Sequence, residues 1–184
     1  MGQAEAAVGA LWVELDRPAQ GLPCLERALE IMEAKFSPEH PVGATARSNL
    51  AEGLRKLGRF EEAIESYRRA ERSFAAGLGP ESVYVAVPLQ GIAEVELARG
   101  RPGAALAVLE RALALRQREE VAPHCLAETR FALARALRDG CLDRPRASAL
   151  ASQALKGLAG QKGEDDAELR RRIEAWLAEG GGGR

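Results

Sequence analysis

An internal repeat with a 42-residue period constrains the fold of this chain more than any other feature of its sequence. The segment LGRFEEAIESYRRA, which starts at Leu57, aligns with RGRPGAALAVLERA, which starts at Arg99. One more step of the same length towards the N-terminus reaches LDRPAQGLPCLERA at Leu15. A fixed period of this length is typical of arrays in which each copy is one supersecondary unit that packs on the next.

Three columns of this alignment hold only glycine or alanine in all four copies. They are Gly9, Ala51, Ala93 and Ala134; Gly21, Ala63, Ala105 and Ala147; and Ala28, Ala70, Ala112 and Ala154. In the fourth copy the first helix is displaced by one residue, because the turn at 140–144 is longer. The first two columns fit the place where the two helices of a hairpin cross, because a side chain larger than a methyl group would push the backbones apart. The repeated unit is therefore predicted to be an antiparallel helical hairpin.

The local sequence signals predict an all-α fold for the 184 residues. The one β-branched run, at 83–87, stops at Pro88, which either delays the start of the next helix or kinks its first turn. Gly58, Gly79, Gly100 and Gly140 are expected to end helices. The predicted hairpin helices span about 3–15, 18–35, 41–57, 60–77, 83–99, 102–119, 124–138 and 144–158.

The expected domain organisation is four hairpins, at about 3–35, 41–77, 83–119 and 124–158, then a capping helix at 164–179 and a flexible tail at 180–184. The ninth helix places Leu169, Ile173, Trp176 and Leu177 on one apolar face, as the end of a repeat array requires. The N-terminus shows no matching cap, because Gly9, Trp12 and Val13 open directly into a repeat. Either a preceding domain covers that face, or the face mediates self-association.

The segment PVGATARSNLAEGLRKLGRFEEAIESYRRA, which starts at Pro41, resembles the tetratricopeptide repeat in the 42-residue form typified by kinesin light chains. The family's small positions match the three columns, and its large positions match Leu50, Leu54 and Tyr67. The resemblance covers residues 3–158 and implies an α-solenoid, a right-handed superhelix that binds a protein or peptide in its concave groove. The sequence departs from the family pattern at Glu33, Ala75 and Gln117, where shorter repeats have a proline, and at Glu96, where a large apolar residue is usual.

The C-terminal stretch that begins with AETRFALARALRDG at Ala127 resembles the end of tetratricopeptide arrays appended to bacterial serine/threonine protein kinases. The sequence contains none of the kinase signatures, neither a Gly-rich phosphate loop nor the HRD and DFG motifs. This resemblance implies the regulatory or docking tail of a bacterial signalling protein, without the catalytic domain.

Charge balance and cysteine usage argue against several functional classes. Lysine and arginine total 26 and aspartate and glutamate 27, whereas nucleic-acid-binding domains usually carry a clustered basic excess. The three cysteines have no metal-ligand spacing, so a reduced, cytoplasmic protein without a metal or other cofactor is expected. No apolar run approaches the roughly 18 residues of a membrane-spanning helix. Neither a nucleic acid nor a membrane is therefore an expected partner.

No catalytic constellation is visible, so the chain is predicted not to be an enzyme. His40 lies in a predicted turn between hairpins, and His124 and Cys125 are helix neighbours whose side chains point about 100° apart. The acidic pairs are expected at helix ends or on exposed faces without a convergent partner. These pairs are Glu61 with Glu62, Glu119 with Glu120, and Asp165 with Asp166.

The resemblance implies that outward residues on the first helix of each hairpin line the groove. The candidates are Thr45, Ser48, Asn49, Glu52, Arg55, Lys56, Gln90, Glu94, Glu128, Phe131, Arg135 and Arg138. Asn49 matches the family position whose amide grips a peptide backbone, but the equivalent positions hold Ala7, Gly91 and Ala132. The two-asparagine, multi-lysine clamp for C-terminal carboxylates is therefore absent. Arg135 and Arg138 are spaced to meet an acidic segment together.

Four interpretations of these residues remain open at the level of sequence. The chain is a protein-binding scaffold, the peptide-sensing arm of a regulator, or a module that forms homo-oligomers through its N-terminal face. The fourth is that the polar groove residues are simply a solvated surface.

Overall fold

The structure is a computed structural model that describes residues 1–37, 40–118 and 120–180. These residues form nine α-helices and two 3-10 turns and contain no strand, so the predicted all-α fold is confirmed. The helices are α1 (Gly2–Glu14), α2 (Pro18–Glu33), α3 (Ala44–Lys56), α4 (Phe60–Leu78), α5 (Ala86–Ala98), α6 (Pro102–Arg118), α7 (Pro123–Asp139), α8 (Arg144–Gly157) and α9 (Glu164–Gly180). The 3-10 turns are η1 (Pro41–Gly43) and η2 (Val83–Val85).

The sequence period is visible in where the helices begin. The second helix of each hairpin starts one full period after the previous one, at Pro18, Phe60, Pro102 and Arg144. Pro18 and Pro102 occupy the first helical position, where the N–H that proline lacks would have no intrahelical partner. The first helices α1, α3 and α5 share the same spacing, whereas α7 begins earlier, at Pro123.

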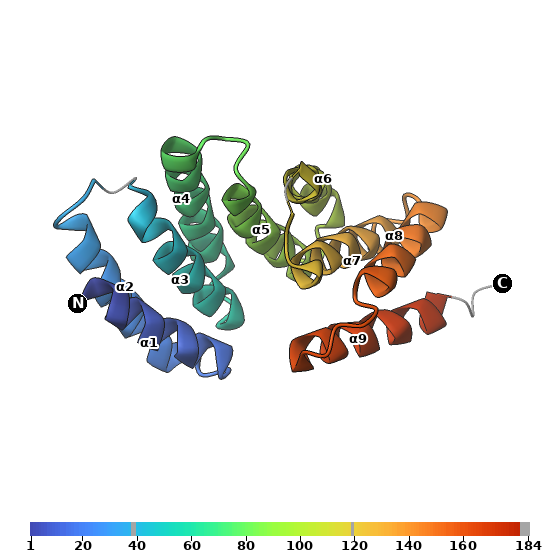
Figure 1. The fold of residues 1–184 in the computed structure, drawn as a ribbon, viewed down its shortest axis with the longest axis horizontal. Coiled ribbons are helices and arrows are strands. Elements are labelled where there is room, and N and C mark those ends of the chain that lie inside the picture. The colour runs from blue at the N-terminus through green and yellow to red at the C-terminus, as the bar shows by residue number, and fades with distance from the viewer. Residues whose placement is uncertain (38–39, 119, 181–184) are drawn as a thin grey trace. The chain divides into compact units, whose positions relative to one another are not determined.

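The chain divides into two compact units, Met1–Val95 and Glu96–Arg184. In the first unit, α1 pairs with α2, α3 pairs with α4, and α2 packs on α3 (Figure 1). In the second unit, α7 pairs with α8, and α6 packs on α7 (Figure 1). The last helix, α9, packs on both α7 and α8.

The small-residue columns are tightly packed. Every alanine in them is at most 1% exposed, and both glycines are buried. A Cβ atom on Gly9 would lie 2.6 Å from Cγ of Leu25, and one on Gly21 would lie 2.6 Å from the carbonyl oxygen of Gly9. Helices α1 and α2 therefore cross where the sequence predicts, at a distance that excludes even a methyl group.

The helix ends follow the predicted glycines with one exception. Gly79 ends α4 with φ of 92°, a left-handed conformation that favours glycine. After α7, Gly140 keeps φ of −78°, and Cys141 takes the positive φ of 53° instead. Helix α5 begins at Ala86, so Pro88 lies in its first turn, where its missing N–H costs no helical hydrogen bond.

Two buried arginines tie neighbouring helices together. Arg47 of α3 is 2% exposed and pairs with Glu33 of α2, while its Nη1 donates to the Ser73 hydroxyl of α4 at 3.4 Å. Arg116 of α6 donates to the Cys125 carbonyl and to the Thr129 hydroxyl, both on α7. Burial lowers the pKa of Arg116, and these two acceptors compensate part of its lost hydration.

Helix α9 buries Leu169, Ile173 and Trp176 against α7 and α8. Its first turn is held by Asp166, whose Oδ1 lies 3.0 Å from His124 Nδ1 on α7. The expectation that Asp166 has no convergent partner is therefore wrong, because the packing of α9 brings together residues 42 positions apart. The predicted tail at 180–184 extends beyond the described residues, as does Glu119 of the predicted acidic pair.

Candidate functional site

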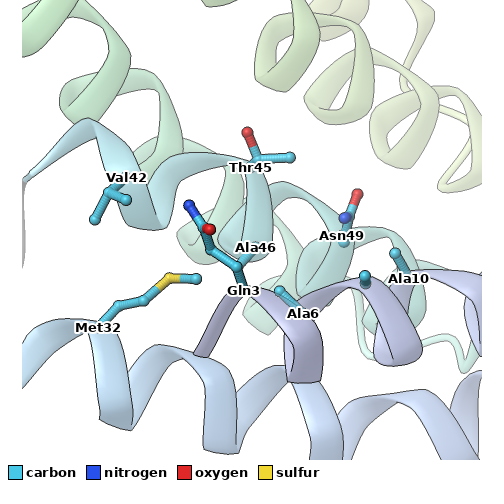
Figure 2. Close-up of a pocket in the computed structure, with 9 residues that line it drawn as sticks. Gln3, Ala6, Ala10, Met32, Val42, Thr45, Ala46 and Asn49 are labelled. Atoms are coloured by element: carbon cyan, nitrogen blue, oxygen red, sulfur yellow. The ribbon is translucent and has the colours of Figure 1, made fainter. Parts of the chain in front are cut away.

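A trough runs along the first two hairpins where α1 lies beside α3 (Figure 2). It consists of two adjoining hollows of about 300 Å³ and 240 Å³, which share Ala10 and Asn49. We call it the α1–α3 trough. Its lining residues are Gln3, Ala6, Ala7, Ala10, Val13, Glu14, Met32, Val42, Thr45, Ala46, Asn49, Glu52 and Lys56.

The floor of the α1–α3 trough is the outer surface of the hydrophobic core. Met32 from α2 is 6% exposed and Ala46 from α3 is 2% exposed, and both pack with Leu29. Partly buried Ala6 and Val42 extend this apolar surface (Figure 2). Since these side chains are fixed by core packing, the floor is preformed for an apolar ligand group.

The rim of the trough carries uncharged polar groups. Asn49 and Thr45 project from α3, one turn apart, and Gln3 projects from α1 (Figure 2). The amides of Gln3 and Asn49 have no hydrogen-bond partner within the described residues. Sequence reasoning placed Asn49 and Thr45 here but missed Gln3, although the 42-residue offset puts Gln3 in the Thr45 column.

Two charged candidates from the sequence are paired within the molecule rather than free for a ligand. Arg55 donates to both carboxylate oxygens of Glu52, at 2.7 Å and 2.6 Å, and Tyr67 donates to Glu52 at 3.0 Å. These bonds to Glu52 raise the pKa of Arg55, and burial raises the pKa of the Tyr67 phenol. Both groups therefore keep their protons, and Glu52 has three of its acceptor sites occupied.

Lys56 and Ser48 also have structural roles. Lys56 Nζ donates to the Val13 carbonyl at 2.9 Å and to Asp16 at 3.1 Å, so it fixes the C-terminal end of α1. The expectation that Ser48 faces outward is wrong. Its side chain is buried, and its hydroxyl donates to the Ala44 carbonyl one turn earlier, at 3.1 Å.

On α5, Gln90 and Glu94 interact with each other, with the Gln90 amide donating to Glu94 at 3.4 Å. Between them Gly91 lies under the ring of Tyr67. A Cβ atom on Gly91 would lie 2.2 Å from Cζ of that ring. Only glycine leaves room at this position for the phenol, so this column has no side chain on α5.

The candidates on α7 lie beside α9. Phe131, expected to face outward, is only 4% exposed, because the Trp176 ring packs edge-on against it with centroids 5.8 Å apart. Arg138 stacks its guanidinium 3.7 Å from the Trp176 ring centroid and donates to the Trp176 carbonyl at 2.8 Å. Arg135 therefore lines a hollow without Arg138 beside it; Glu128 contacts His124 at 3.4 Å.

The structure does not bring the histidines and cysteines into a reactive group. His40 Nδ1 accepts a hydrogen bond from the Val42 N–H at 3.2 Å, and its ring stacks on Phe36. Both contacts stabilise the turn between the first two hairpins. Among the described residues, no cluster of three His, Cys, Asp or Glu side chains could hold a metal ion. Within the same residues, no helix has the length and apolar character needed to cross a membrane.

The family model of the tetratricopeptide repeat matches residues 3–76 and 44–118, which together make up more than half of the chain. The chain belongs to the tetratricopeptide repeat family. No curated protein matches its sequence. Tetratricopeptide repeats act in general as protein-binding scaffolds rather than as catalysts, which agrees with the expected function class.

Solved tetratricopeptide structures share the fold of this chain. BtubC from P. vanneervenii is 24% identical with a TM-score of 0.78, and the match covers 89% of this chain and 66% of BtubC. A putative kinesin light chain with nearly identical TPR-like repeats from Podospora anserina is 19% identical with a TM-score of 0.74, over 97% of this chain and 84% of that one. The resemblance to kinesin-light-chain-like repeats, predicted from the 42-residue period, is confirmed at the level of fold.

Proposed function

We propose that this chain is a non-catalytic scaffold that binds an extended segment of a protein partner in the α1–α3 trough. The observation that carries the proposal is the pairing of a preformed apolar floor with two amides, of Gln3 and Asn49, that no described residue satisfies. An amide offers one acceptor and two donor hydrogens, which suits the alternating C=O and N–H groups of an extended backbone. An apolar side chain of the same segment would contact Met32 and Ala46.

The charges at the end of the trough favour a partner of mixed charge. Glu14 and Glu52 line this end together with Lys56, whose ammonium is engaged by Asp16 and the Val13 carbonyl. A basic side chain of the partner would complement Glu14, so a segment with an apolar residue followed by a basic one fits this surface. Such exposed contacts give an affinity on the order of micromolar.

The cellular context of this scaffold is a bacterial cytoplasmic signalling protein. Its support is the resemblance of the stretch from Ala127 onward to arrays appended to serine/threonine kinases. In that setting the trough would dock a regulator or substrate of the kinase. The peptide-sensing arm of a regulator is a related alternative, and it would bind a free short peptide in the same trough.

The test starts from a partner recovered by pull-down and reduced to its shortest binding peptide. Gln3→Ala combined with Asn49→Ala should weaken binding about tenfold, because two backbone hydrogen bonds are lost. Ala7→Trp should abolish binding by filling the trough from an exposed helix position. The matched control is Gln153→Ala, which removes an exposed amide from α8. If this control weakens binding while the trough variants do not, the trough is not the site.

Self-association is a second candidate, favoured by a specific exposed stripe. Val8 and Leu11 of α1 and Leu15 just after its end are 48%, 54% and 58% exposed. Leu11→Glu should abolish any concentration-dependent association in sedimentation equilibrium if this stripe joins two copies. A chain that is monomeric before and after the substitution rules this function out.

A further inference from the structure

The second unit has a hollow that does not belong to the repeated architecture. It lies between α7 and α9, has a volume of about 310 Å³, and is lined by Phe131, Arg135, Arg172, Ala175, Trp176 and Glu179. We call it the α7–α9 pocket. Its floor is rigid, because Phe131 and Trp176 are almost fully buried and pack edge-on against each other.

Two guanidinium groups reach this pocket from opposite helices. Arg135 comes from α7, and Arg172 comes from α9 with its guanidinium carbon 6.0 Å from the centre of the Phe131 ring. No acidic side chain among the described residues forms an ion pair with Arg172. Glu179, the one carboxylate in the lining, is turned towards Arg138 at 3.9 Å.

We propose that the α7–α9 pocket binds the carboxylate of a glutamate or aspartate side chain from an acidic segment of a partner protein. Arg172 donates two N–H groups to the carboxylate oxygens, Arg135 adds positive charge to the wall of the pocket, and an apolar side chain next to the acidic residue rests on Trp176. Charge-assisted bonds from guanidinium groups to a carboxylate are among the strongest polar contacts in proteins. This site goes beyond the α1–α3 trough, since it lies on other helices and does not require the trough to be occupied.

A short acidic segment fits this pocket better than a nucleic acid. The two cations are confined to one hollow, and the exposed carboxylate of Glu179 also lines it. A polyphosphate backbone that crossed the pocket would run past this carboxylate, and the chain as a whole carries a net charge of −1. A single acidic side chain that reaches Arg172 carries far less negative charge past Glu179, whose carboxylate is turned towards Arg138.

The experiment uses the full chain and a fluorescein-labelled Gly-Ser peptide with one central Glu-Leu-Glu segment. A matched peptide carries glutamine in place of both glutamates. We expect the glutamate peptide to bind at least about tenfold more tightly, and Arg172→Glu to remove this preference. Arg172→Gln should give the same loss without charge reversal, and circular dichroism and the melting temperature of both variants check the fold.

The matched control is Arg171→Glu, which makes the same charge change one residue away. Arg171 is 71% exposed and pairs with Glu168 at 2.6 Å, so its reversal should change affinity less than about twofold. Equal losses for Arg171→Glu and Arg172→Glu would overturn the proposal, because the attraction would then reflect net charge alone. Unchanged binding in the Arg172 variants would overturn it as well.

Two further measurements separate this site from its competitors. Asn49→Ala should leave the affinity for the Glu-Leu-Glu peptide unchanged, so failure of the trough proposal and failure of this one are distinguishable. If Asn49→Ala weakens this peptide, the peptide binds in the trough and the pocket assignment is wrong. If a single-stranded oligonucleotide binds more tightly than the peptide, and Arg172→Glu weakens it to the same extent, the pocket binds phosphate groups and the proposal is wrong.

Discussion

The α1–α3 trough and the α7–α9 pocket are both hollows beside the first helix of a hairpin, but they differ in chemistry. The trough has an aliphatic floor, with Met32 and Ala46, and the uncharged amides of Gln3 and Asn49 stand above that floor. The pocket has an aromatic floor and a cationic rim. The trough therefore suits a polypeptide backbone with an apolar side chain, whereas the pocket suits a carboxylate.

The difference follows from how each hollow is built. The trough lies between the equivalent helices α1 and α3 of the first two hairpins. The pocket needs α9, a helix outside the repeat, which supplies Arg172, Ala175, Trp176 and Glu179. A repeat protein can thus acquire a second type of surface from a single added helix.

The largest effect should come from Trp176→Ala, which removes the floor of the pocket and leaves the trough intact. We expect a loss of about 3–5 kcal/mol in the free energy of unfolding, because a buried indole is deleted. Hydrogen exchange should accelerate in α7, α8 and α9. If the amides of α1 and α3 lose protection to the same extent, the two units unfold as one, and the prediction of a local effect is wrong.

Overpacking the helix crossings should affect the two units alike. Ala63→Leu in the first unit and Ala147→Leu in the second each enlarge a side chain at a position that is at most 1% exposed. Each should cost about 1–3 kcal/mol in denaturant unfolding. The control Ala149→Leu changes an exposed position of α8 and should stay within about 0.5 kcal/mol. If one of the two leucine substitutions leaves the free energy of unfolding unchanged, the helices of that hairpin pack less closely than those of the other.

The link between His124 and Asp166 should make a smaller contribution to the second unit. His124→Gln and Asp166→Asn should each cost about 1 kcal/mol, since each removes a half-buried contact between α7 and α9. Glu128→Gln, which affects only a contact within α7, should cost less than about 0.5 kcal/mol. A double-mutant cycle measures the coupling, and additive losses for the first two variants would contradict a direct contact.

The smallest effect, and the sharpest contrast in chemistry, should be in the salt dependence of binding. Raising the salt from about 0.05 M to about 0.5 M should weaken an acidic peptide at the pocket about threefold or more, because exposed charges are screened. An uncharged peptide, held in the trough by the amides and by apolar contacts alone, should change less than about twofold. Equal salt dependence at both sites would contradict the assignment of charged contacts to the pocket and uncharged contacts to the trough.

Sequence reasoning predicts what repeats and misses what depends on distant partners. The 42-residue period predicts where α2, α4, α6 and α8 begin, and it places Asn49 in the trough. It does not reveal that Lys56 bonds the carbonyl of Val13 or that Arg138 bonds the carbonyl of Trp176. Those contacts depend on how the helices pack. From the sequence alone, Lys56 and Arg138 could equally be exposed cations.

Arg172 shows the same limit for the pocket. In the sequence it belongs to the polar face of the last helix, opposite Leu169, Ile173 and Trp176, where a solvated arginine is the natural expectation. Its position over Phe131 depends on how α9 is rotated about its axis against α7. The spacing of apolar residues within α9 does not predict that rotation. Gln3, by contrast, could have been found by extending the Thr45 column one copy towards the N-terminus.

The contact between Tyr67 and Gly91 also limits which hairpins are interchangeable. Gly91 stands one repeat period after Asn49, so the two occupy one column, and the Tyr67 ring fills the space that a side chain at Gly91 would need. A tandem duplicate of residues 44–85, inserted after Val85, would place a second Asn49 beneath that ring and cause a steric clash. The equivalent of Tyr67 in the first copy is the smaller Leu25, which leaves room for Asn49 itself. The second hairpin therefore cannot be followed by a copy of itself without a steric clash, so the hairpins are not interchangeable in order.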